Sequence, residues 1–189
     1  MRLLQHLTEI KEIAKEDIIK RLKKDCKPFL QEIKKAKGFL YRGSSYYVQT
    51  MRKAIPRTDR KPTDTPIKLH DQANDFFIKK FGWAGRNGVF ASHLIQALQY
   101  GRDATGTYLF FPIKEYKFIW SPEIDDFWID LIDDVGIFDQ KYFNMMLKTY
   151  IDTDLSKAID LQGEIMFKCE SYYLVHRKYE NVIKQEFDI

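Results

Sequence analysis

The sequence predicts an α+β domain, in which a small β-sheet is flanked by helices. Two kinds of segment support this fold class: stretches with apolar residues at helical spacing, and short runs of aromatic and β-branched residues between turn signals. The chain has 189 residues, of which 44% are hydrophobic and 31% charged. This is the size and composition of one soluble domain with one core, so we expect residues 1–189 to fold as a single domain.

The first residues predict two helices. Apolar side chains recur at helical spacing over residues 3–22, which indicates an amphipathic helix with one buried face. Pro28 interrupts the pattern, and residues 29–37 predict a second, shorter helix. We expect residues 1–37 to form a helical cap on a core that spans 38–189.

The next part of the chain alternates between strands and helices. Residues 39–43 have the composition of a strand, and residues 44–66 indicate a long basic loop. A helix is predicted over 67–81, and a glycine-rich turn follows it. Residues 89–91 then predict a short strand, which leads into a helix over 94–100.

The last third predicts a central strand and further helices. Residues 106–113 give the strongest strand signal in the chain. Residues 122–150 indicate one or two helices broken near Gly136, and a short helix follows at 155–159. Residues 164–175 predict one bent strand or a tight strand pair, followed by a polar tail.

Composition excludes several classes of protein. Cys26 and Cys169 lie far apart and outside any CxxC motif, which argues against a disulfide scaffold and a zinc module. The four histidines have no ligand spacing, so we expect no metal. No run approaches the roughly 20 apolar residues of a membrane span, and charges interrupt the first residues too early for a secretory signal. We expect a cytoplasmic protein with no membrane partner.

Charge is distributed unevenly along the chain. Residues 1–61 hold 17 Lys and Arg against 7 Asp and Glu, a net charge of +10, so the remainder carries −6 of the total of +4. A basic face of this kind can contact the phosphates of a nucleic acid, but lysines on solvated helices are also common. Part of this charge lies in the loop, at Arg52, Lys53, Arg57, Arg60 and Lys61.

Familiar nucleotide, zinc-protease and serine-hydrolase motifs are absent, and three short signatures remain. These are LYRGS at 40–44, NGVFASHLIQALQYG at 87–101 and QGEIMF at 162–167. Each lies at the edge of a predicted strand. In this order they resemble the ADP-ribosyltransferase superfamily, whose members carry an Arg or His on a first core strand, a serine-bearing strand that leads into a helix, and a Glu that opens a later strand.

The resemblance assigns a role to each signature. Arg42, followed by Gly43, matches the arginine of the Arg-Ser-Glu subgroup and would hold a phosphate or ribose of NAD. Ser92 matches the serine, although the usual Ser-Thr-Ser triplet is here Phe90-Ala91-Ser92. Glu164 matches the catalytic glutamate. Gln162 completes a Q-x-E motif, which in the family is associated with amide-bearing protein acceptors or guanine bases.

Two aromatic residues complete the expected site. In the polymerase-type members a tyrosine one helix after the strand stacks on nicotinamide, which makes Tyr100 a candidate stacking residue with Phe90. The resemblance implies a mono-ADP-ribosyltransferase on a split mixed sheet, with NAD as a substrate and no metal. The acceptor would be a macromolecule, either DNA or RNA or otherwise a protein.

Each of these residues also has a purely structural interpretation. Ser92 precedes a helix and can be its N-cap, and Arg42 can be a surface ion-pair partner. Glu164 can be a solvated glutamate at a strand end, and aromatic residues at these spacings are frequently core. The alternative functions are therefore a nucleic-acid- or protein-binding module without turnover on the same fold, and a structural or assembly protein, for instance of a virus.

Overall fold

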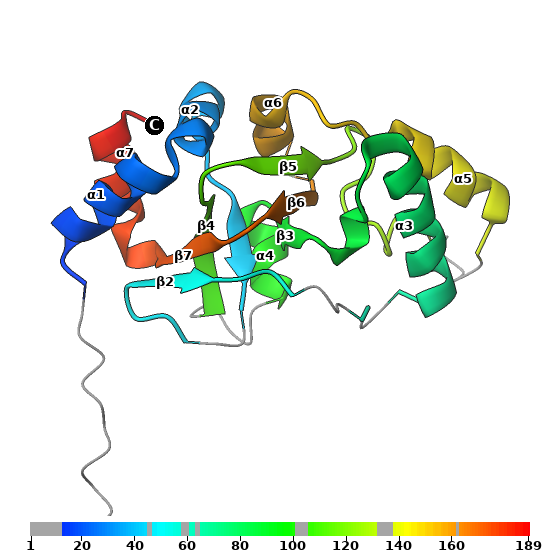
Figure 1. Cartoon of the computed structure of the whole chain (residues 1–189), viewed down its shortest axis with the longest axis horizontal. Coiled ribbons are helices and arrows are strands. Elements are labelled where there is room, and N and C mark those ends of the chain that lie inside the picture. Colours follow the sequence, from blue (N-terminus) through cyan, green and yellow to red (C-terminus); the bar gives the residue numbers. More distant parts are fainter. Residues whose placement is uncertain are drawn as a thin grey trace, which may run out of the picture.

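The computed structural model describes residues 13–44, 47–57, 61–62, 65–100, 106–131, 138–161 and 163–189. Its strands form two sheets (Figure 1). The four-stranded sheet has the order β1 (Tyr41–Gly43), β4 (Thr107–Pro112), β7 (Tyr172–His176) and β2 (Met51–Ala54). The three-stranded sheet has the order β3 (Val89–Ala91), β6 (Ile165–Cys169) and β5 (Tyr116–Ile119). The chain is thus α+β as predicted, but every strand pairing among the described residues is antiparallel rather than mixed.

Most of the helices lie at the two ends of the molecule, with α4 and α6 between them (Figure 1). The helices α1, α2 and α7 lie at one end, and α3 and α5 lie at the other. Their bounds, with those of α4 and α6, are α1 (Lys15–Asp25), α2 (Lys27–Ala36), α3 (Ile67–Phe81), α4 (Leu94–Tyr100), α5 (Gln140–Thr149), α6 (Leu155–Asp160) and α7 (Glu180–Phe187).

The three-stranded sheet separates two hydrophobic cores. Because successive side chains of a strand point to opposite faces, β6 contributes to both. Ile165 and Phe167 lie in the larger core, which the two sheets share with α1 and α2, whereas Met166 lies in the smaller core against α3 and α5. A strand buried on both faces is held firmly, and residues at its start are therefore well positioned for a site.

The first helices share the larger core. Leu22 of α1, together with Phe29 and Ile33 of α2, is fully buried in it. The predicted first helix begins later than expected, at Lys15, and residues 1–12 lie outside the described residues. Pro28 lies in the first turn of α2, where a backbone N–H has no partner within the helix, so the missing N–H of proline costs no hydrogen bond. The proline therefore marks the start of the second helix as well as the end of the first.

Several predicted elements are confirmed. The helix over 67–81 and the strand over 89–91 have the expected bounds, and residues 164–175 form a strand pair, β6 and β7. Four predictions are wrong. The loop over 44–66 contains β2, and β5 follows β4 where no strand was expected. Residues 122–131 form bends and turns, so among the described residues only the later part of the region predicted as one or two helices, 122–150, is helical, as α5. The polar tail contains α7.

Candidate functional site

The two sheets meet at a seam between the first two sequence signatures. The backbone of Tyr41 in β1 pairs with that of Ser92 after β3, through N···O distances of 2.8 and 2.9 Å. The Arg42 side chain strengthens this seam, because its Nη1 donates a hydrogen bond of 2.6 Å to the Phe90 carbonyl oxygen. Signatures that are 48 residues apart in the chain therefore lie side by side.

The third signature reaches the same place through β6, which pairs with β3. Glu164 lies directly before β6, and its backbone N–H donates to the Asp125 carbonyl oxygen at 3.0 Å. The side chain of Gln96, on α4, donates to the same carbonyl at 2.9 Å. Gly163 permits this close approach, because a Cβ there would lie 3.1 Å from the Ile124 carbonyl oxygen. The Asp125 carbonyl oxygen thus joins the start of β6 to α4.

A cavity of about 150 Å³ lies where these elements converge. Six of the seven residues that the sequence singles out line it: Arg42, Gly43, Phe90, Ser92, Tyr100 and Glu164. Gln162 lies outside the described residues. The cavity also has walls that the sequence did not predict, among them Thr65, Arg86, Asp126 and Trp128.

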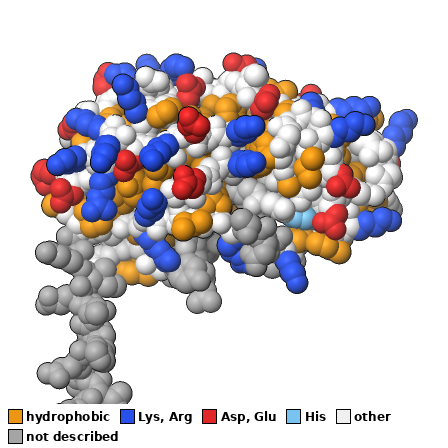
Figure 2. Space-filling view, in the orientation of Figure 1, with side chains coloured by type: hydrophobic (Ala, Val, Ile, Leu, Met, Phe, Trp, Pro, Cys, Tyr) orange, Lys and Arg blue, Asp and Glu red, His pale blue; other side chains and the backbone are white. Residues whose placement is uncertain are grey.

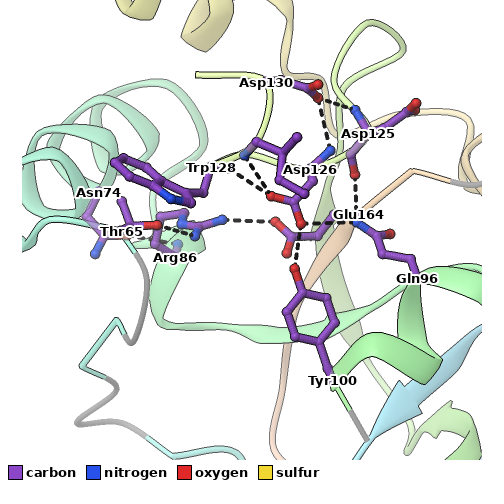
Figure 3. A network of polar contacts seen from close by, with 11 residues as sticks. Thr65, Asn74, Arg86, Gln96, Tyr100, Asp125, Asp126, Trp128, Asp130 and Glu164 are labelled. Carbon is purple, nitrogen blue, oxygen red and sulfur yellow. Dashed lines mark hydrogen bonds and ion pairs between the residues drawn. The ribbon is translucent and has the colours of Figure 1, made fainter. Parts of the chain in front are cut away.

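Arg86 is the principal residue that the sequence analysis missed (Figure 3). Its Nη1 lies 2.9 Å from Oε1 of Glu164, and the two side chains are only 8% and 12% exposed. The guanidinium also lies 4.1 Å from the ring centroid of Phe127 and 4.8 Å from that of Phe90. Burial and then the nearby Glu164 carboxylate raise the pKa of the Tyr150 phenol well above its ordinary range, so Tyr150 stays neutral beside the ion pair.

The chain places Arg86 on the 3-10 helix η1 (Gly85–Asn87), in a turn that two glycines pack tightly. A Cβ on Gly85 would lie 2.3 Å from Cδ1 of Ile119, and one on Gly88 would lie 2.6 Å from the Phe167 carbonyl oxygen. The turn therefore lies against both β5 and β6. Its sequence, WAGRNG, indicates a glycine-rich turn but not that the arginine points into a cavity.

A second unpredicted carboxylate, that of Asp126, anchors the rim of the cavity. Its Oδ2 accepts a hydrogen bond from the Tyr100 hydroxyl, and its Oδ1 accepts from the backbone N–H groups of Trp128 and Ile129 at 2.9 and 3.1 Å. These side-chain to backbone bonds fix the turn at residues 126–129. Tyr100 is 53% exposed, so its ring forms part of the cavity mouth.

Three of these side chains make contacts within the chain that the sequence did not predict. The Ser92 hydroxyl donates to the His93 carbonyl oxygen at 3.4 Å, rather than to a group on Arg42 or Glu164. The Phe90 ring, expected to stack on nicotinamide, lies against the Arg86 guanidinium. Arg42 lies beside the Tyr172 ring, at 5.8 Å from its centroid, as well as bonding to the Phe90 carbonyl.

A larger open groove, of about 1130 Å³, lies between α2, β5 and the start of α6. Its lining mixes lysines with acidic residues and does not gather one charge. Its cysteine, Cys169, is a poor nucleophile, because burial raises the pKa of the thiol to about 12. The smaller cavity is therefore the better candidate site, since residues of all three signatures line it.

The described residues also lack two features. They contain no group of three or more His, Cys, Asp and Glu side chains placed to hold a metal ion. Within the same residues, no helix is both long enough and apolar enough to cross a membrane. No family model, curated protein or solved structure matches the chain, so the site is interpreted from its own geometry.

Proposed function

We propose that this chain is an NAD-dependent mono-ADP-ribosyltransferase, which breaks the bond between nicotinamide and ribose and transfers ADP-ribose to a macromolecular acceptor. The observation that carries the proposal is the convergence of Arg42, Ser92 and Glu164 on one cavity, from three distant signatures in the order that the superfamily has. Two sheets that meet where the backbones of Tyr41 and Ser92 pair are also compatible with the split sheet of that superfamily.

The cavity suits one flat ring rather than a whole dinucleotide. Its volume of about 150 Å³ is close to that of an engineered apolar cavity that binds benzene in another protein, and it is below the roughly 300–1,000 Å³ of a typical ligand pocket. The nicotinamide ring would enter beside Tyr100, and the phosphates and adenosine would lie outside the cavity. Arg42 uses one N–H on the Phe90 carbonyl, and its remaining donors suit a phosphate.

Glu164 is the residue with the chemistry that this reaction needs. Departure of nicotinamide develops positive charge on the ribose, as in glycoside hydrolysis. A carboxylate near that sugar stabilises the transition state more than the ground state, and it acts more strongly where water is excluded. The Glu164 side chain is 12% exposed, so its charge acts in an environment of low dielectric.

The proposal is tested by incubating the purified protein with NAD, with and without nucleic acid or cell protein. Nicotinamide release is measured by chromatography, and addition of ADP-ribose to the acceptors is measured by mass spectrometry. We expect release in all samples and added mass in one acceptor fraction. Absence of both release and NAD binding with every acceptor would contradict the proposal.

A second candidate function is a binding module that has lost turnover. The observation that favours it is the Arg86 to Glu164 ion pair, because a carboxylate already paired with a cation is less able to stabilise a second positive charge. The same experiment separates the two functions. A binding module retains NAD or the macromolecule without releasing nicotinamide.

A basic segment that leads to the cavity at Pro62 favours a nucleic acid as the acceptor. Lys53 on β2, Arg57 and Lys61 are exposed, and the adjacent Pro62 lines the cavity. Arg60 lies outside the described residues. Lysines and arginines also gather over α1 and α2, where acidic side chains are interspersed with them (Figure 2). Of the two groups, the segment from Lys53 to Lys61 is the one whose end adjoins a cavity residue, Pro62, so it is the better placed to hold an acceptor strand.

Replacing Lys53, Arg57 and Lys61 together by glutamine should weaken nucleic-acid modification on the order of tenfold and flatten its salt dependence, because fewer counterions are released on binding. Nicotinamide release without acceptor should not change. The matched control replaces Lys20, Lys24 and Lys27, on α1 and α2, by glutamine. Equal loss of modification in both triple variants would exclude a specific role for the segment from Lys53 to Lys61.

A further inference from the structure

We propose that Arg86 is the positioning residue of Glu164, which holds the carboxylate at a fixed place in the cavity so that it faces the ribose when NAD binds. This inference rests on the proposed function, because it takes Glu164 as the catalytic carboxylate. It adds a residue from outside the three signatures. The contact that carries it is the 2.9 Å hydrogen bond between Nη1 of Arg86 and Oε1 of Glu164.

The guanidinium is enclosed on several sides. The rings of Phe127 and Phe90 lie against it, with centroids at 4.1 and 4.8 Å, and Thr65 Oγ1 lies 3.5 Å from Nη2. With a side chain that is 8% exposed, Arg86 has little rotamer freedom. An arginine that merely neutralised charge at the surface would need none of these contacts.

The backbone that bears Arg86 is held as firmly as its side chain. The Arg86 N–H donates to Oδ1 of Asn74 on α3 at 2.9 Å. The amide nitrogen of Asn74 contacts Asn87 Oδ1 at 3.2 Å and His70 Nε2 at 3.0 Å. These bonds join the turn to α3 on one side, while Gly85 and Gly88 pack it against β5 and β6 on the other. Arg86 is thus a fixed support rather than a gate that swings.

The stability of the fold does not explain why the ion pair of Arg86 and Glu164 is buried. Nε of Arg86 is buried with no hydrogen-bond partner in the described part of the chain, and an unsatisfied buried donor destabilises the folded state by about 1–3 kcal/mol. Replacing a buried ion pair by apolar residues is frequently neutral or stabilising. A fold does not need this pair, whereas a carboxylate that must be held within a fraction of an ångström does.

The test compares nicotinamide release by the wild type with that by Arg86→Met, Arg86→Lys and Arg86→Ala. In Arg86→Met we expect kcat to fall about 10- to 100-fold with KM for NAD nearly unchanged, because a misplacement of about 1 Å can cost 10²-fold in rate. Arg86→Lys should recover part of the loss. Millimolar guanidinium, but not sodium chloride of equal ionic strength, should raise the rate of Arg86→Ala. The control, Arg21→Met on the exposed side of α1, should behave as wild type.

Two results would overturn the inference. One is a kcat of Arg86→Met equal to or above that of wild type, which would make the ion pair dispensable or inhibitory. The other is a fall in kcat that guanidinium does not restore, accompanied by an equal loss of NAD binding, which would make Arg86 a structural residue only.

Failure of the proposed function is recognised separately. If the wild type releases no nicotinamide, the proposed function is wrong, and thermal unfolding of Arg86→Met, Glu164→Gln and the double variant then tests the pairing itself. If the double variant melts at a higher temperature than both single variants, the two side chains are coupled in the folded protein. The ion pair would then be a structural element without a catalytic role. Additive losses would overturn the pairing as well.

Discussion

Glu164→Gln is expected to lower nicotinamide release by about a thousandfold, the scale on which removal of one preorganised electrostatic contact acts. Glutamine has nearly the size of glutamate and can still accept a hydrogen bond from Arg86, but it carries no charge. The positive charge on the ribose exists only in the transition state, so kcat should fall while the affinity for NAD changes little. Steady-state rates and NAD binding by calorimetry measure the two quantities.

The matched control is Glu170→Gln. Glu170 lies in the turn between β6 and β7, close in sequence to Glu164, but its side chain is exposed and lines the other groove. Its rate should stay within about twofold of wild type, as surface substitutions rarely disturb a distant site. A Glu164→Gln protein with wild-type melting and more than a tenth of the wild-type rate would contradict a catalytic role for Glu164.

A second variant, Glu164→Asp, separates a loss of catalysis from a loss of folding. Glu164→Gln leaves the buried Arg86 guanidinium without its charged partner, and such a loss can cost about 3–5 kcal/mol. Glu164→Asp keeps the charge in the cavity and withdraws the carboxylate by one methylene. It should fold better than Glu164→Gln and still lose most of its activity, because the reaction depends on the position of the charge.

The candidate site could be predicted only where its residues belong to strand signatures. Arg42, Ser92 and Glu164 lie at strand edges, where short motifs can be recognised in a sequence. Arg86 lies on a turn, and its partner is 78 residues further along the chain, so no local pattern joins them. The glycines at 85 and 88 indicated a turn, but the direction of the arginine depends on tertiary packing.

The fold could be predicted where burial leaves a regular pattern in the sequence. The helix α3 buries one face and ends at Gly82 in the left-handed conformation (φ 78°), so both its periodicity and its end can be read. The strands β2 and β5 have four residues each and expose part of their side chains, and α7 buries only Ile183 among its described residues. Short elements with so few buried positions give no periodic signal.

The helices α1 and α2 belong to the larger core, so a substitution in them should have a large effect on the stability of the protein. The sequence predicted residues 1–37 as a cap, but Phe29 of α2 is fully buried beneath both sheets. Its ring centroid lies 6.1 and 6.0 Å from those of Phe110 and Phe111 on β4, and 5.9 and 6.0 Å from those of Tyr116 on β5 and Phe167 on β6. Phe29 therefore joins the helices to both sheets.

Phe29→Ala is expected to lower the free energy of unfolding by about 3–5 kcal/mol, because it removes buried apolar area and leaves a cavity among aromatic rings that cannot close. That is a large fraction of the roughly 5–15 kcal/mol by which domains are stable, and urea denaturation measures it. Tyr47→Ala, at a side chain that is 66% exposed, is the control and should cost less than about 0.5 kcal/mol. A loss below about 1 kcal/mol in Phe29→Ala would mean that α2 packs on the sheets as a separable cap, whereas the full loss, with one cooperative transition, would mean that the helices and both sheets fold as one unit.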